Sequence, residues 1–248
     1  MKELLATTPV LWERLQAADK PIVLYGMGDG ADKILNYCET LGIPVQGIFA
    51  SDEFVRGHLF RGYVVEKYAS IKKRLGDMIV LVAFGTQNPE VMEQILRLGE
   101  EQELYAPDVP VAGEEYFTKD FFVEHLEEFE KVNSLLADTL SQKTFQHCIR
   151  FKLSGKLSYL EEISVSPTEI FETIFPLGDQ AFFVDAGAYN GDTVLEFINL
   201  VGNKYQGILA IEPSKRNYKR LLKNTEGLPN FFTFQGAAWD SKDILYFK

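Results

Sequence analysis

Short apolar runs alternate with amphipathic segments over the first 110 or so residues of the chain. The runs are typical of strands buried in a parallel sheet, and the segments between them carry apolar residues at helical spacing. Strands are expected at 21–25, 45–50, 63–65 and 78–84, and helices at 10–18, 32–41, 68–75 and 89–98. Strands that alternate with helices predict a parallel sheet covered on both faces. The pattern therefore predicts a Rossmann-like α/β domain over residues 1–112.

The periodicity becomes purely helical between residues 113 and 165. Apolar side chains recur at three- and four-residue steps, at Phe122, Leu126, Phe129, Val132 and Leu136. Thr118 is placed to cap the first of these helices. The glutamates of this segment carry no spaced histidine partners, so a solvated acidic face is expected rather than a metal site. We interpret residues 113–165 as a helical connector.

A strand, a glycine-bearing loop and a helix follow one another around residue 185. The apolar run Phe182–Val184 ends at Asp185, the loop contains Gly187 and Gly191, and an amphipathic helix begins at Thr193. This order places a nucleotide site at the carboxyl edge of a doubly wound sheet. The loop reads D-x-G-x-x-x-G rather than the G-x-G-x-x-G of dinucleotide binders. It therefore predicts a compact, partly cationic ligand instead of a pyrophosphate.

Two further strands are expected downstream of this loop. The run 207–211 ends at Glu212, about twenty residues after the loop, where an acidic side chain reaches ribose hydroxyls in doubly wound folds. Pro213 and Ser214 begin the next helix, with Ser214 as its N-cap. The run 231–234 is a third strand, and it leads into Ala237 and Ala238.

The segments FVDAGAYNGDTVLEF, ILAIEPSKRNYKRLLKN and FFTFQGAAWDSKDILYF, over roughly residues 180–248, resemble the front of an FkbM-type S-adenosylmethionine-dependent O-methyltransferase. The resemblance implies that residues 166–248 form the N-terminal part of a class I methyltransferase domain, with S-adenosyl-L-methionine as cofactor. It implies that the loop holds the methionine part, that Glu212 binds the ribose, and that residues beside the third strand flank the adenine. The cofactor-binding residues expected on this basis are Asp185, Gly187, Ala188, Tyr189, Asn190, Gly191, Thr193, Glu212, Pro213, Ala237 and Ala238.

The sequence departs from the pattern of that family in two places. Tyr189 stands where members often carry asparagine, and Asn190 follows it. The fourth strand of the family, with its D-x-E-G segment, is not in the sequence, which ends in an apolar stretch at 243–248 that predicts one more strand. The chain is therefore expected to be an incomplete fragment with little or no turnover. The acceptor implied is a hydroxyl of a sugar, lipid or polyketide-like small molecule, and no catalytic residue is assigned.

Composition excludes several classes of function. The net charge is −11 and the basic residues form no cluster, which argues against a nucleic-acid partner. No apolar stretch approaches the roughly 20 residues of a membrane span, and the N-terminus has no secretory signal. Cys38 and Cys148 lie far apart and are expected to be reduced thiols, which suits a cytoplasmic protein.

A second candidate site lies in the first domain. Gly26, Gly28 and Gly30 follow the first strand with G-x-G-x-G spacing, and Asp52 follows the second strand. One alternative function is therefore a nucleotide- or nucleotide-sugar-binding module that uses this turn; equally, the glycines can serve only to permit a tight turn between strand and helix. A third alternative is an interaction protein whose acidic helical connector docks a partner.

Overall fold

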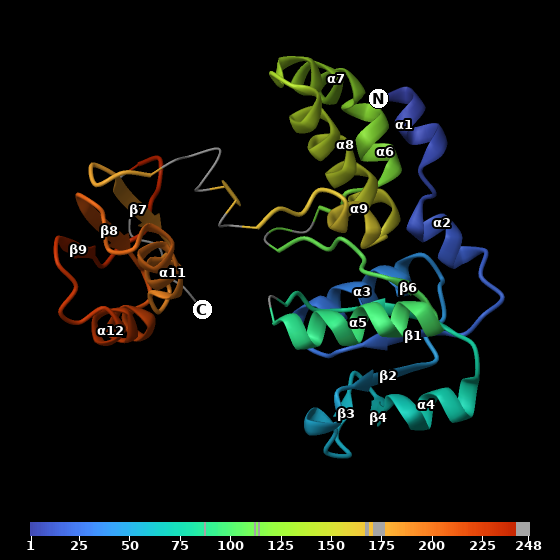
Figure 1. Cartoon of the computed structure of the whole chain (residues 1–248). Coiled ribbons are helices and arrows are strands. Elements are labelled where there is room, and N and C mark those ends of the chain that lie inside the picture. The colour runs from blue at the N-terminus through green and yellow to red at the C-terminus, as the bar shows by residue number, and fades with distance from the viewer. Residues whose placement is uncertain (87, 112, 114, 167–168, 171–176, 242–248) are drawn as a thin grey trace. The chain divides into compact units, whose positions relative to one another are not determined.

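The structure is a computed structural model, which describes residues 1–86, 88–111, 113, 115–166, 169–170 and 177–241. Contacts divide the chain into two units, Met1–Ser164 and Val165–Lys248. Each unit contains its own sheet with helices packed on it (Figure 1). The prediction of two Rossmann-like α/β parts is confirmed, and the two units are described separately.

The described part of the first unit contains a six-stranded sheet in the order β3-β4-β2-β1-β5-β6. The strands are β1 (Ile22–Tyr25), β2 (Gly47–Ala50), β3 (Leu59–Phe60), β4 (Tyr63–Lys67), β5 (Ile79–Val82) and β6 (Glu103–Tyr105). Neighbouring strands run parallel except for the short β3–β4 hairpin. From the central β1 the chain first builds outward through β2 and β4, and then returns to build β5 and β6 on the other side. This reversal creates a switch point between β1 and β5, where open α/β sheets bind ligands beyond the strand ends.

Helices cover both faces of this sheet, as the continuous apolar strands predict. The helices are α1 (Lys2–Thr7), α2 (Leu11–Gln16), α3 (Asp29–Thr40), α4 (Tyr68–Leu75) and α5 (Pro89–Glu101), with a short 3-10 turn η1 (Asp52–Phe54). On one face, α2 and α3 bury Leu24 and Ile48. On the other face, α4 and α5 bury Val23 and Val80. Adjacent residues of β1 are therefore buried on opposite sides of the same sheet.

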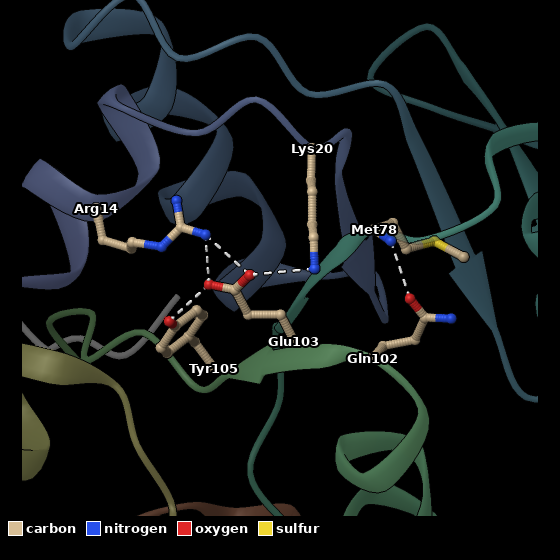
Figure 2. Close-up of polar contacts among 6 residues, drawn as sticks. All are labelled: Arg14, Lys20, Met78, Gln102, Glu103 and Tyr105. Atoms are coloured by element: carbon tan, nitrogen blue, oxygen red, sulfur yellow. Dashed lines mark hydrogen bonds and ion pairs between the residues drawn. The ribbon is translucent and has the colours of Figure 1, made fainter.

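A polar network anchors the outer strand β6 to the rest of the first unit (Figure 2). The side chain of Gln102 is buried, and its Oε1 accepts a hydrogen bond of 2.9 Å from the backbone N–H of Met78. The carboxylate of Glu103 pairs with Arg14 at 2.8 Å and with Lys20 at 3.7 Å. Gln102 thus satisfies a buried backbone donor, whereas Glu103 forms ion pairs that are partly open to solvent.

We expect Gln102→Leu to destabilise the first unit far more than Glu103→Gln. The leucine leaves the Met78 N–H buried without an acceptor, which costs about 1–3 kcal/mol. The Glu103 ion pairs are partly exposed, so their weakening costs about 0–1 kcal/mol. Urea unfolding of the full chain, followed by the fluorescence of the buried Trp12, measures both changes. Equal unfolding midpoints for the two variants would contradict this account of the network.

The helices after the first sheet are α6 (Lys119–Glu124), α7 (Leu126–Leu135), α8 (Thr139–Ser154) and α9 (Ser158–Glu161). Thr118 caps α6 as predicted, because its Oγ1 accepts a 3.1 Å hydrogen bond from the N–H of Phe121. Contacts group these helices with the first sheet: Phe122 and Leu153 pack against Leu4 of α1, and the N–H of Ala106 donates to the carbonyl of Gly155. The domain boundaries at residues 112 and 165 stay a prediction.

The described part of the second unit contains a three-stranded parallel sheet in the order β7-β8-β9. The strands are β7 (Phe182–Ala186), β8 (Gly207–Ile211) and β9 (Phe231–Phe234), and the helices are α11 (Asp192–Val201) and α12 (Lys215–Asn224) (Figure 1). The two helices pack on one sheet face, where Phe197 of α11 and Leu221 of α12 cover Ala210. Side chains of the opposite face are more than half exposed at Phe182, Val184, Phe232 and Phe234. The strand expected at 243–248 lies outside the described residues.

Candidate functional site

The carboxyl ends of β7 and β8 bring two acidic side chains to the same face of the second sheet. The register pairs Asp185 with Ala210, two residues before Glu212. The N–H of Glu212 donates to the carbonyl of Phe234, so the strand-like course of the backbone continues to this residue. Side chains two residues apart along a strand share a face. Asp185 and Glu212 therefore lie on the face that α11 and α12 cover.

The loop between β7 and α11 crosses the end of β8. The N–H groups of Gly187 and Ala188 both donate to the carbonyl of Ile211, at 2.8 and 2.9 Å. No atom lies within 4 Å of the place where a side chain at Gly187 would begin, and its φ is +111°. At Gly191, by contrast, a Cβ would lie 3.0 Å from Leu221 and from Thr225. Gly187 thus leaves open space beside the backbone, and Gly191 permits close packing between α11 and α12.

Glu212 holds the loop in place from within the unit. Its side chain is buried, with 5% of the residue exposed. One carboxylate oxygen accepts a 2.9 Å hydrogen bond from the N–H of Tyr189, and the other accepts a 2.8 Å bond from the N–H of Ser214. Tyr189 has a φ of +45°, which is uncommon for a residue with a side chain. A carboxylate has about four acceptor positions, so these two bonds leave capacity for a ligand.

Asp185 carries an unsatisfied buried oxygen. Among the described residues, its Oδ2 is buried without a hydrogen-bond partner. Burial raises the pKa of Asp185, and the negative charges of Asp192 and Glu212 raise it further. A buried polar atom without a partner costs free energy. A cationic or hydrogen-bond-donating ligand at this oxygen would remove that cost.

The remaining predicted residues lie around this pair of carboxylates or follow β9. Asn190 shapes the start of α11: its Oδ1 accepts from the N–H of Asp192, and its carbonyl accepts from Asn224. The N–H of Thr193 donates to the side chain of Asp192. Pro213 joins Glu212 to Ser214, which caps α12 as predicted. Ala237 and Ala238 are exposed residues in the segment after β9.

Asp192 was absent from the set predicted from sequence. Its N–H donates to Asn190 and its side chain accepts from the N–H of Thr193, so it lies among the predicted loop residues, and its negative charge helps to raise the pKa of Asp185. Asp192 occupies the first turn of α11. Acidic residues are common there because they interact favourably with the positive end of the helix dipole, whatever the function of the site. An acidic residue at the start of the helix that follows a D-x-G loop is the signal that could have identified it.

The glycines of the first unit have mostly structural roles. A Cβ at Gly26 would lie 2.5 Å from the ring of Phe84, and a Cβ at Gly30 would lie 2.3 Å from the carbonyl oxygen of Ala83. The predicted start of the helix at residue 32 is wrong: α3 begins at Asp29, so Gly30 lies inside it. This early start is sterically possible because a glycine lets the first helical turn approach β5. Gly28 is different, since open space surrounds the position of its absent side chain.

Asp52 does not share a pocket with the three glycines of the turn. Its carboxylate pairs with Lys67 at 2.8 Å, and it borders a separate pocket on the α4 and α5 side of the sheet. Within the ranges that the structure describes, no three histidine, cysteine or acidic side chains come together in a way that could hold a metal ion. No helix in the same ranges combines the length and apolar character needed to cross a bilayer.

These features define an α/β protein with a Rossmann-like sheet in each unit and a loop site at the carboxyl edge of the second. No family model matches the sequence, and no curated protein matches it. Among solved structures, the chain is similar to the crystal structure of methyltransferase FkbM from Methylobacillus flagellatus KT, at 17% sequence identity and a TM-score of 0.58. The match covers 96% of this chain and 66% of that chain, so this chain spans about two thirds of the length of the solved protein. The fold is therefore that of an FkbM methyltransferase, as the sequence motifs predicted.

Proposed function

We propose that the protein is an S-adenosylmethionine-dependent O-methyltransferase of FkbM type. The observation that carries this proposal is the convergence of Asp185 and Glu212 at the ends of adjacent parallel strands, with Oδ2 of Asp185 buried and unpaired. Acidic side chains in these positions suit a ligand that brings hydrogen-bond donors and positive charge. The likeness of the fold to a methyltransferase supports the same ligand.

The chemical groups of S-adenosylmethionine are suited to the acceptor oxygens of Asp185 and Glu212. The cofactor carries an ammonium group, a sulfonium and two ribose hydroxyls. Asp185 would accept a hydrogen bond from the ammonium group, and Glu212 would accept from the ribose through its unused acceptor positions. The open space at Gly187 would let the methionine part approach the backbone. Ala237 and Ala238 would flank the adenine ring. The other residues assigned to this site are Ala188, Tyr189, Asn190, Gly191, Thr193 and Pro213.

When bound, the cofactor would supply a methyl group on a sulfonium: a bond from that carbon to the acceptor oxygen would form as its bond to sulfur breaks, with S-adenosylhomocysteine as leaving group and the hydroxyl proton lost to solvent. The contribution of the chain is to hold the methyl donor in one orientation relative to the acceptor hydroxyl, which is a proximity effect. The acidic cluster of Asp185, Asp192 and Glu212 also disfavours phosphorylated nucleotides through charge repulsion. The acceptor class proposed is a hydroxyl of a sugar, lipid or polyketide-like small molecule.

The proposal is tested by calorimetric titration of the full chain with S-adenosylhomocysteine. We expect saturable binding that excess NAD does not displace. Gly187→Val fills the open space and is expected to weaken binding about tenfold or more. Gly202→Val is the matched control, because Gly202 also has a positive φ and open space but lies at the end of α11. Absence of binding by the parent chain, or equal binding by both variants, would overturn the assignment.

A further inference from the structure

A cavity lies at the switch point of the first sheet. It has a volume of about 570 Å³, a size common for small-molecule sites. It is lined by Gly30 near the start of α3 and by residues 82–86, which end β5 and follow it. Residues 106–111, Phe151 of α8 and Leu160 of α9 also line it. The helices after the first sheet thus contribute a wall to the place where open α/β sheets bind ligands.

The side chains that line the cavity favour a flat aromatic group. Two thioethers, Met27 and Met92, and two aromatic rings, Phe84 and Phe151, face the cavity. Aromatic rings stack on one another, and thioether sulfur packs well against a ring. Leucine and isoleucine side chains complete the apolar wall. The buried part of a ligand would therefore be planar and uncharged.

The charges at the cavity disfavour phosphate groups. Asp29 lines it and pairs with Lys33 at 2.6 Å, and the same ammonium donates to the carbonyl of Pro110. Asp108 also lines it and pairs with Lys152 at 2.9 Å. Both lysines are thus neutralised by carboxylates. Asp29 further occupies the first turn of α3, where the positive end of the helix dipole would otherwise attract a phosphate.

We propose that this cavity binds a nucleoside-like ligand without phosphate groups, its aromatic ring lying between the methionine and phenylalanine side chains. The neutral polar part would extend toward the open space at Gly28 and toward Thr86, which borders the cavity. This site is separate from the one assigned to S-adenosylmethionine, and it does not depend on that assignment. It differs from the alternative of a nucleotide- or nucleotide-sugar-binding module at the glycine turn, because the ligand proposed carries no phosphate.

The first test is equilibrium dialysis of the full chain against adenosine, guanosine, cytidine and uridine, each beside its 5′-diphosphate. We expect at least one nucleoside to bind, and its diphosphate to bind about tenfold more weakly, because the phosphates would lose hydration at a cavity where Lys33 and Lys152 are already paired with carboxylates. Failure of all four nucleosides to bind would overturn the proposal. Tighter binding of the diphosphate would overturn it as well, in favour of a nucleotide site.

Variants locate the bound nucleoside. Gly85 lines the cavity, and a Cβ added there meets no atom within 4 Å, so Gly85→Leu is expected to be tolerated, to take up part of the cavity and to weaken binding about tenfold. Gly178→Leu, equally unobstructed but in the second unit, is the matched control and should bind like the parent. Phe151→Ala removes one ring and is expected to weaken binding about fivefold. Circular dichroism checks that each variant is folded.

Adenosine is also part of S-adenosylmethionine, so the two sites must be distinguished. Gly187→Val is expected to lose S-adenosylhomocysteine binding and to keep nucleoside binding. Gly85→Leu is expected to do the reverse. Nucleoside binding that is lost in Gly187→Val and kept in Gly85→Leu would place the nucleoside in the second unit and overturn the proposal. Failure of the methyltransferase assignment alone would leave nucleoside binding intact and sensitive to Gly85→Leu.

Discussion

Replacement of Asp185 by asparagine is expected to weaken the binding of S-adenosylhomocysteine about 100-fold, because a charge-assisted hydrogen bond to its ammonium group is lost. The same variant is expected to raise the melting temperature of the ligand-free protein at neutral pH. The reason is that Asp185 has a buried oxygen without a partner, and that the negative charges of Asp192 and Glu212 disfavour its own charged form. Calorimetric titration measures the first effect and thermal unfolding measures the second.

The sign of the stability change follows from the pKa of Asp185, which burial and the charges of Asp192 and Glu212 raise above its usual value. Folding then favours the protonated form, so this contribution to stability is complete below the unfolded pKa of about 3.9 and is lost as the pH rises through the folded pKa. The stabilising effect of Asp185→Asn should therefore appear near pH 7 and fade at acidic pH. Asp179→Asn, at an exposed residue before β7, is the control. A variant that binds the ligand like the parent, or melts lower at pH 7, would contradict this role for Asp185.

Glu212→Ala is expected to release the loop between β7 and α11. The change removes the acceptor of two backbone donors, the N–H groups of Tyr189 and Ser214, and each donor left without a partner costs about 1–3 kcal/mol. Hydrogen exchange of the loop peptide should become much faster, and unfolding in urea should occur earlier. Glu212→Gln keeps one acceptor oxygen and is expected to lie between the parent and the alanine variant.

The control for this change is Glu226→Ala, which removes an exposed glutamate from the turn after α12. It should leave loop exchange unchanged. Equal behaviour of Glu212→Ala and Glu226→Ala would show that the buried carboxylate does not hold the loop.

The fold was largely predictable because its strands are short apolar runs bounded by turn residues. The predicted strands at 207–211 and 231–234 match β8, which begins at Gly207, and β9, which Asn230 precedes. The start of α3 was predicted wrongly because glycine is normally a poor helix residue. Gly30 nevertheless lies in the first turn of α3. That turn packs against the carbonyl of Ala83, where a residue with a side chain would not fit. That contact joins positions far apart in the sequence, and local pattern does not reveal it.

The sequence predicted that Asp185 and Glu212 meet at one sheet edge, but it did not predict their contacts, and their binding of a cofactor stays a prediction. The motif identified Asp185, Gly187 and Glu212, because strand, loop and strand fix which ends meet at one sheet edge. It did not reveal that the Glu212 carboxylate accepts hydrogen bonds from the N–H groups of Tyr189 and Ser214. Both hydrogen bonds depend on the path of the folded backbone. The cavity of the first unit was hidden for the same reason: Phe151 and Leu160 reach it only through tertiary packing.

A crystal structure of the full chain with S-adenosylhomocysteine tests the central claim most directly. We predict electron density for the ligand at the carboxyl ends of β7 and β8, with its ammonium group at Asp185 and its ribose at Glu212. Ligand density at another place in the chain, or a loop at residues 187–191 without ligand in a crystal grown at saturating concentration, would contradict the claim.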